Sequence, residues 1–231
     1  MPYSLDPQQL RVAFANGEIQ DGGRLVKFHS VEVGPVELSS GAITACDPLV
    51  VPDAPAYSQA IPNGSFPVTL AIAAFPNQDE RVAFARVTFA QEEPSHWRMA
   101  LLPSQEDGQL GDDEFFGYGV DSGTGCFMDA VAGQFLCERM KQDKRFYDVI
   151  SDDMQKTYRH TRSWLNFQPR PDRPENVICF SSGFGDGSYP SFFGLSADNR
   201  PLVLITDFQV LLGEESDVDD GAKPWWKFWA R

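Results

Sequence analysis

Short hydrophobic runs separated by turn-forming residues occupy the first part of the chain. Alternation within one of them is informative, because apolar Val87 and Phe89 alternate with polar Arg86 and Thr88. Runs rich in β-branched and aromatic residues are typical of strands, and the alternation predicts a strand with one buried face. The runs are LVKFHSVEV (25–33), GAITACDPLVV (41–51), FPVTLAIAAF (66–75), RVAFARVTFA (81–90) and HWRMALL (96–102).

Helical patterns occur at the N-terminus and in the middle of the chain. Residues 6–16 predict a short helix, with Asp6 as N-cap, Pro7 in the first position and Gly17 after the end. Asp129 can cap a second helix that runs to about Gln142. Along one side of this helix the apolar residues are Val131, Phe135 and Met140.

A third predicted helix covers about 145–160, because apolar residues recur there at helical spacing. Those residues are Phe146, Val149, Ile150, Met154 and Tyr158. The polar segment 104–114 predicts a loop, and the Pro-rich link QPRPDRPEN ends the helical section.

The last strands surround a glycine-rich stretch. NVICF (176–180) and PLVLITDF (201–208) are almost wholly apolar, which predicts strands buried on both faces. YPSFFGL (189–195) predicts a further strand, joined to the last one by a hairpin turn at SADNR. Strands, two helices and strands again predict an α+β fold: a mostly antiparallel sheet, sandwich-like or strongly curved, with the two central helices on one face.

One domain over 1–212 is expected, followed by an acidic linker and a Trp-rich tail over 213–231. Three roles stay open for the aromatic tail: folding back onto the domain, docking to a partner, or lying at a membrane surface. The aromatic residues of the tail are Trp225, Trp226, Phe228 and Trp229.

Charge narrows the range of partners. The formal net charge is −14, from 33 acidic and 19 basic residues. This charge repels phosphates, so neither nucleic acid nor a membrane is an expected partner. It favours a basic protein partner, although acidity can also serve solubility alone. The four cysteines form no CxxC pair, and the N-terminus has no signal-peptide pattern, so buried reduced thiols and a cytoplasmic location are expected.

Glycine, aspartate and hydroxyl residues concentrate in GYGVDSGTGCFMDA (117–130) and SSGFGDGSYPS (181–191). Neither segment matches a dinucleotide fingerprint or a P-loop. Backbone amides in such loops can form an anion-binding nest, but this signal is weak, and the geometry of tight turns alone explains the glycines. The candidate ligand-binding residues are Asp47, Asp121, Gly123, Gly125, Ser182, Gly183, Gly185, Asp186 and Tyr189.

Several residues are candidates for catalysis, but none of them belongs to a complete catalytic motif. Ser182 lacks a nucleophile elbow, because Phe180 replaces its first glycine. Cys126 precedes the helix at Asp129, whose dipole could lower the thiol pKa, but a histidine base would be needed. The aspartates could bind a hard cation, or cap helices and turns instead, and no metal site or cofactor is assigned. The candidate catalytic residues are Asp121, Cys126, Asp129, Ser182, Asp186 and Asp207.

TACDPLV, GYGVDSGTGCFMDA and NVICFSSGFGDGSYPSFFGLSADNRPLVLITDF together resemble a bacterial family, domain-of-unknown-function family 4241. The resemblance covers about 34–208 and implies no activity. The positions that it singles out are Asp47, Asp121, Gly123, Gly125, Asp129, Ser182, Gly183, Gly185, Asp186, Gly187, Tyr189 and Asp207.

We therefore expect a binding or interaction protein whose two glycine-rich loops meet at one sheet edge in a polar cleft. One version is an immunity-type inhibitor of a basic protein, which the negative charge would attract. The alternative is a hydrolase, metal-dependent in one form, that uses the clustered aspartates with Ser182 or Cys126. A small-ligand-binding domain is a third hypothesis, and it requires a concave pocket.

Overall fold

Two antiparallel sheets form the framework of the computed structural model, which describes residues 1–211 apart from the side chain of Asp107. The larger sheet contains β1 (Glu18–Asp21), β2 (Arg24–Leu38), β4 (Gly64–Ala74), β5 (Glu80–Thr88), β6 (His96–Met99), β7 (Gly117–Val120), β11 (Gly187–Leu195) and β12 (Pro201–Asp207). The smaller sheet contains β3 (Ile43–Cys46), β8 (Thr124–Asp129), β9 (Trp164–Phe167) and β10 (Val177–Ser181).

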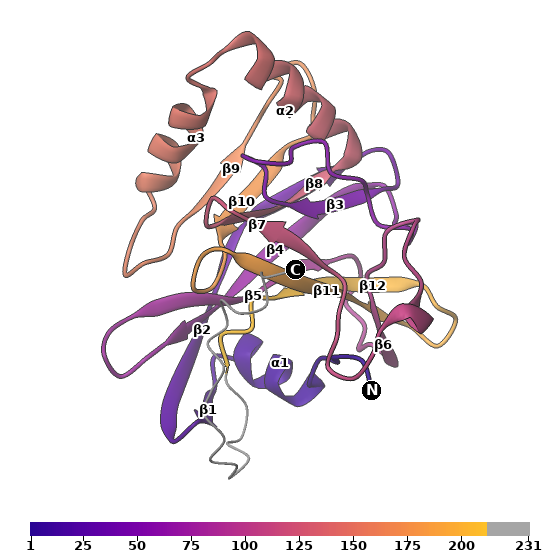
Figure 1. Cartoon of the computed structure of the whole chain (residues 1–231), viewed down its shortest axis with the longest axis vertical. Helices are drawn as coiled ribbons and strands as arrows, with labels where there is room; N and C mark the ends of the chain where they lie inside the picture. The colour runs from indigo at the N-terminus through magenta and orange to yellow at the C-terminus, as the bar shows by residue number, and fades with distance from the viewer. Residues whose placement is uncertain (212–231) are drawn as a thin grey trace.

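The larger sheet curls strongly into a half-barrel (Figure 1). Its strand order is β1-β2-β4-β5-β12-β11-β6, and β7 pairs with β11 outside this path. The smaller sheet has the order β3-β8-β10-β9. The predicted α+β class with a mostly antiparallel, strongly curved sheet is therefore confirmed.

Each predicted hydrophobic run contains a strand, and four further strands escaped the sequence analysis. One of them, β8, is fully buried and lies inside the glycine-rich segment 117–130. The other three, β1, β7 and β9, have four residues each, and they are partly exposed. Such short strands offer too few apolar positions to create a visible pattern. The segment 104–114 is a loop, as expected, with one 3₁₀ turn at Asp107–Gln109.

Three α-helices occur in the described part of the chain: α1 (Pro7–Phe14), α2 (Ala130–Gln142) and α3 (Phe146–Gln155). Both predicted N-caps are confirmed, since Asp6 accepts the Gln8 amide at 2.8 Å and Asp129 accepts the Val131 amide at 2.7 Å. Helix α3 is shorter than the sequence predicts, and Tyr158 lies beyond its end and is exposed.

The buried side of α2 differs from the predicted one, whereas in α3 the predicted residues Phe146, Ile150 and Met154 are buried. In α2 the buried residues are Ala132, Gly133 and Leu136, and in α3 Val149 is 41% exposed. A Cβ atom on Gly133 would lie 2.5 Å from the carbonyl oxygen of Pro52. Helix α2 therefore packs closely against the segment at Pro52 through a small residue, Gly133. A pattern of large apolar residues does not predict a buried side of this kind.

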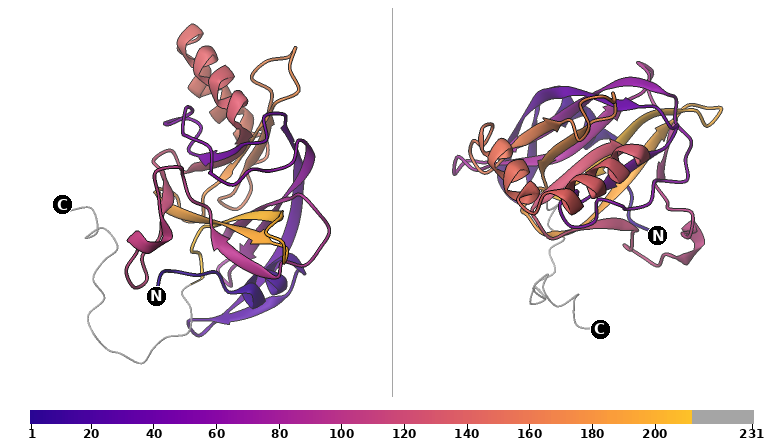
Figure 2. Two further views of the ribbon diagram at one scale, coloured as in Figure 1. Left: turned by 90° about the vertical axis from the view of Figure 1, so that its right-hand side faces the viewer. Right: turned by 90° about the horizontal axis from the view of Figure 1, so that it is seen from above.

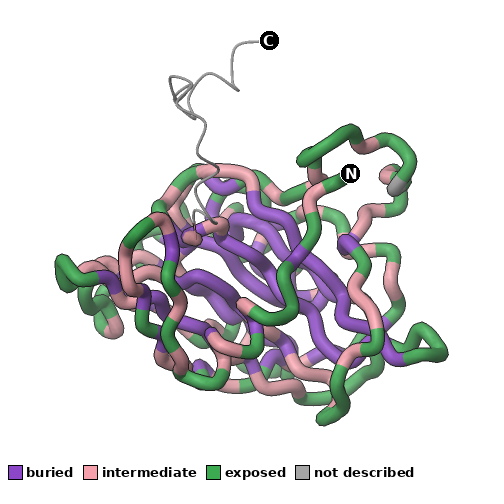
Figure 3. Tube along the Cα trace, turned by 90° about the horizontal axis from the view of Figure 1, so that it is seen from below, coloured by how far each residue is buried: buried purple, intermediate pink, exposed green. Residues whose placement is uncertain are grey.

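The molecule is layered, and the smaller sheet lies between the helices and the larger sheet (Figures 1 and 2). Cys126, Met128 and Val177 pack with Leu136 and Ile150 of the two helices. On the other face of the same sheet the buried residues are Ile43, Ala45, Phe127, Ile178 and Phe180, which join the core of the larger sheet. Figure 3 shows that the buried positions follow the strands and the exposed ones the loops.

The strands on either side of the 182–186 segment belong to different sheets, so this segment is not a hairpin turn. The hairpin predicted at SADNR is confirmed, since it joins β11 to β12 and the Ser196 amide donates to the Arg200 carbonyl. The predicted linker and Trp-rich tail, 213–231, lie outside the described residues. Within residues 1–211, none of the helices has the length and apolar character that crossing a membrane requires.

Candidate functional site

The two glycine-rich segments meet at the corner between the sheets. β7 pairs with β11 in one sheet, and β8 pairs with β10 in the other, so the 121–123 and 182–186 connections pass side by side from sheet to sheet. The Ser182 amide donates to the Gly123 carbonyl at 3.1 Å. The Gly123 amide donates to Asp186 Oδ1 at 3.0 Å. The pairs β7–β11 and β8–β10 thus continue into each other as one long strand pair, which bends from the larger sheet into the smaller one.

Backbone conformation explains the glycines of this corner. Gly123, Gly183 and Gly185 have φ of +66°, +48° and +115°, a region that side chains with a Cβ adopt rarely. At Gly183 space is also limited, because a Cβ would lie 2.9 Å from the Phe208 carbonyl oxygen. The bend therefore requires glycine for geometric reasons that involve no ligand.

Asp47 holds the 121–122 backbone of the corner in place from the buried side. Its side chain has no exposed surface and accepts the Asp121 and Ser122 amides at 3.0 and 2.8 Å. It also accepts the Ser122 hydroxyl at 2.8 Å and the Leu49 amide at 3.0 Å. Four donors replace the water that a buried carboxylate loses, so Asp47 acts in the structure as a fixed acceptor for backbone groups.

Ser182 closes its own loop. Its side chain is buried, and its hydroxyl donates to the Gly185 carbonyl at 2.8 Å. The Tyr189 hydroxyl donates to the same carbonyl, also at 2.8 Å. None of the hydrogen bonds described for residues 1–211 joins a histidine to Ser182 or Cys126, so the general base that a serine or cysteine nucleophile needs is not positioned.

Cys126 lies within β8 rather than in the first turn of α2. It stands in register with Cys46 on one side and Cys179 on the other, and the Cys46 and Cys126 sulfur atoms are 3.7 Å apart. The hydrogen bond with Cys126, together with burial, raises the pKa of Cys46. Burial raises the pKa of Cys179. These environments disfavour thiolates and describe packed, unreactive thiols.

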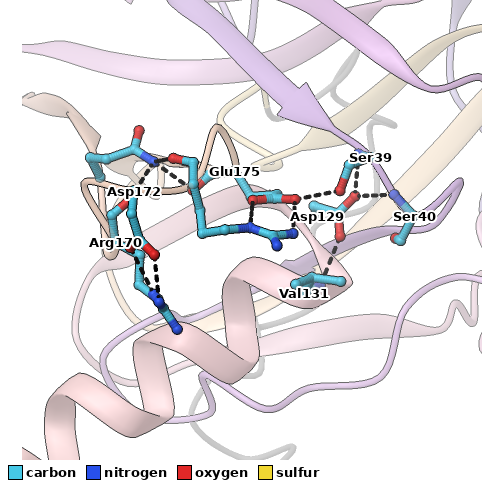
Figure 4. Close-up of polar contacts among 9 residues, drawn as sticks. Ser39, Ser40, Asp129, Val131, Arg170, Asp172 and Glu175 are labelled. Atoms are coloured by element: carbon cyan, nitrogen blue, oxygen red, sulfur yellow. Dashed lines mark hydrogen bonds and ion pairs between the residues drawn. The ribbon is translucent and has the colours of Figure 1, made fainter.

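Asp129 belongs to a polar network at the start of α2, on the smaller sheet (Figure 4). Its second oxygen accepts the Ser39 and Ser40 amides at 2.8 and 2.9 Å. Ser39 in turn donates its hydroxyl to Glu175 at 2.6 Å. Asp129 therefore joins the 39–40 turn to the helix, away from the glycine-rich corner.

Glu175 is a member of this network that the sequence analysis missed. It is buried and accepts two hydrogen bonds from the Arg173 guanidinium, at 2.9 and 3.2 Å. This pairing lowers the pKa of Glu175 to about 2, with the Ser39 hydroxyl acting in the same direction. A charged residue inside a Pro-rich link has no sequence signal that distinguishes it from a solvated one.

Asp207 occupies a third place, on the face of the larger sheet that adjoins the N-terminal segment. The Tyr3 hydroxyl donates to it at 2.6 Å and the Gln209 amide at 2.7 Å. Burial raises the pKa of Asp207. The four candidate catalytic aspartates thus lie at three separate places in the fold, and only Asp121 and Asp186 lie together, at the corner.

The solvent side of the corner carries Asp121, Asp186 and an aromatic ring. Phe184 is 53% exposed, stacks on Phe75 with 6.2 Å between ring centroids, and lies 5.2 Å below the guanidinium of Arg81. Among the described residues, no group of three or more His, Cys, Asp or Glu side chains could hold a metal ion. The exposed chemistry of the corner is therefore two carboxylates and an aromatic ring, and the Arg81 guanidinium over this ring is paired with Asp79.

Comparison with known proteins identifies a family but no characterised relative. None of the curated proteins and none of the solved structures shows a significant match to the chain. A family model described as "Protein of unknown function (DUF4241)" matches residues 36–206, a region that includes both glycine-rich segments and Asp47. Because this region is more than half of the sequence, the chain belongs to the DUF4241 family.

Proposed function

We propose that this chain is a binding protein that recognises a basic protein partner through the exposed surface of the glycine-rich corner. The observation that carries the proposal is Phe184, an aromatic side chain left exposed at the tip of a tightly hydrogen-bonded loop. Aromatic side chains on rigid supports are typical centres of protein interfaces, because they bury a large area and lose little conformational freedom.

Charge at the corner supports a basic partner. Asp121 and Asp186 are both exposed, on the same two connections of the corner that carry Gly123 and Phe184. Asp186 Oδ1 accepts the Gly123 amide, and this bond holds the carboxylate in position. The net charge of −14 would add long-range attraction for a positively charged protein and would raise the association rate. An inhibitor of the immunity type is one protein of this kind.

A hydrolase receives less support from the same residues. Ser182, Asp129 and Asp207 each use their polar atoms in hydrogen bonds to other parts of the fold. General acid–base or nucleophilic catalysis requires such groups to converge on one reacting atom. Binding by the exposed residues requires no rearrangement of these contacts.

A photoreactive amino acid placed at position 184 tests the proposal in cells that produce the protein naturally. The matched control places it at position 147, because Tyr147 on α3 is an aromatic residue of similar exposure, 48%. We expect one protein, basic in composition, to be cross-linked from position 184 and not from position 147. Equal cross-linking from both positions, or none from 184, contradicts the proposal.

The partner captured in this way then permits a charge test. Asp186→Asn keeps an oxygen that can accept the Gly123 amide, so Asp121→Asn combined with Asp186→Asn removes charge without removing that bond. We expect affinity at low salt to fall on the order of tenfold, and its salt dependence to weaken. Unchanged affinity at low salt would show that the carboxylates do not contribute.

A further inference from the structure

A groove on the other side of the larger sheet has a chemistry separate from that of the corner. It has a volume of about 730 Å³ and lies between α1, the segment 90–94 and the faces of β4, β5 and β12. Its apolar lining includes Phe14, Pro94, Trp97, Val203 and Ile205. Both the size and the mixed lining are in the range of small-molecule sites.

The floor of the groove is a row of side chains across adjacent strands. Thr69 is paired with Arg86, and Arg86 with Ile205, so residues of three neighbouring strands lie directly opposite one another. Glu32 of β2 continues the row beside Thr69. Thr88, two positions along β5 from Arg86, faces the same way and also lines the groove. A guanidinium and two hydroxyl groups therefore share one face.

Arg86 is the unusual member of this row. Its guanidinium carbon lies 3.9 Å from the ring centroid of Phe14, and its Nε atom is buried without a hydrogen-bond partner. It forms no ion pair with any residue in the range 1–211, whereas Arg24, Arg162 and Arg200 are each paired with a carboxylate. A buried donor without an acceptor is costly, and its presence in a groove indicates an acceptor that arrives from outside.

We infer that this groove binds a small organic carboxylate, with the carboxylate on Arg86 and an apolar substituent along Trp97 and Val203. A planar guanidinium matches a carboxylate through two parallel hydrogen bonds, and Phe14 holds the guanidinium plane in place. The Thr69 and Thr88 hydroxyls supply further donors on the same face.

The acidic residues around the groove select for a singly charged ligand. Glu32 and Glu93 line it, and the charge of Glu93 opposes the decrease in Arg86 pKa that burial causes. Glu92 also lines it but is paired with Arg200. The groove is lined by two guanidinium groups, those of Arg86 and Arg11, and by these carboxylates. The carboxylates repel a doubly charged phosphate more strongly than a singly charged carboxylate.

Calorimetric titration of the full chain tests the inference with N-acetylphenylalanine, benzoate and acetate as probes. N-acetylphenylalaninamide, which has the same apolar group and no carboxylate, is the matched ligand control. We expect N-acetylphenylalanine to bind more tightly than acetate, because of the apolar lining, and the amide to bind about tenfold more weakly or not at all. Inorganic phosphate is titrated in parallel.

Two variants locate the site. Arg86→Gln is expected to weaken N-acetylphenylalanine binding about tenfold or more. Arg139→Gln is the protein control, because Arg139 also stacks on a phenylalanine, Phe146, but lies on α2. It should bind as the wild type does. Urea unfolding of the Arg86→Met variant gives a second readout. If the Arg86 guanidinium serves ligand binding, the variant should be as stable as the wild type or more stable. If the guanidinium serves only to stabilise the fold, the variant should be less stable.

Three results would overturn the inference. The first is no carboxylate binding by the wild-type chain at millimolar concentration. The second is equal binding of N-acetylphenylalanine by the Arg86→Gln variant. The third is tighter binding of inorganic phosphate than of any carboxylate, which would contradict the ligand class.

Discussion

Asp47 and Arg86 are both largely withdrawn from water, but their surroundings differ. Asp47 accepts four hydrogen bonds, three of them from backbone amides, and is held as part of the fold. Arg86 has a buried Nε atom without an acceptor. Native proteins rarely leave a buried donor unpaired unless it has a role, so the residue without a partner is the better candidate for binding than the residue with four.

Glu175 provides a prediction at the residue scale, through the pH dependence of stability. Its pKa is about 2 in the folded chain and 4.5 when unperturbed, so its stabilising contribution is present above pH 4.5 and is lost as the pH falls towards 2. Glu175→Gln should therefore lower the free energy of unfolding by roughly 1.5–3 kcal/mol at neutral pH. The difference from wild type should shrink steadily between these two pH values, which urea unfolding at a series of pH values measures.

Asp172→Asn is the matched control for this prediction. Asp172 also pairs with an arginine, Arg170, in the same Pro-rich link, but it is exposed. Water screens exposed pairs, so this change should leave the free energy of unfolding unchanged. If the two variants behave alike, the buried network shown in Figure 4 does not stabilise the fold.

At the element scale, the strand pairs β7–β11 and β8–β10 continue into each other around the corner between the sheets. Turning a strand pair from one layer to another requires backbone angles that glycine adopts without strain. Phe208, which directly follows β12, packs against Gly183 from inside the bend. The corner is therefore held by a local conformation and by a long-range contact.

Alanine substitution can separate these two contributions. Gly123→Ala meets no atom within 4 Å, so only its φ of +66° opposes the change, at a cost of roughly 1–2 kcal/mol. Gly183→Ala adds a clash with Phe208, and we expect a further loss of roughly 1–3 kcal/mol. Urea unfolding midpoints at constant slope measure both. Equal losses for the two variants would mean that Phe208 moves aside freely.

The sequence predicted those features that depend on near neighbours. Asp6 and Asp129 cap their helices through amides two residues away, and a pattern of nearby residues is enough to find them. The hydrogen bonds that Asp47 accepts from the Asp121 and Ser122 amides cross 74 and 75 positions of the sequence, and no local pattern contains them. For the same reason Arg86 could be predicted to lie on a polar strand face, but the groove around it could not.

At the scale of the whole molecule, the layer order places Cys46, Cys126 and Cys179 between the smaller sheet and its two helices. Burial of this kind makes the three thiols reporters of global unfolding. Cys137, in α2, is only partly buried, and its pKa is raised, chiefly by desolvation.

A chromogenic aromatic disulfide should therefore react with no more than one thiol of the folded chain, and slowly, because both access and thiolate content are low. All four thiols should react at once in denaturant. Spectrophotometric titration of thiols with and without guanidinium measures this. Rapid reaction of two or more thiols under native conditions would show that the helices open away from the smaller sheet without global unfolding.

Because the bend between the layers explains Gly123, Gly183 and Gly185 without a ligand, these three glycines report a shape. A chain that carries glycines at the same spacing is expected to turn between two layers in the same way, whatever it binds. What distinguishes one such chain from another is then expected to lie in the side chains displayed around the bend and on the open strand faces.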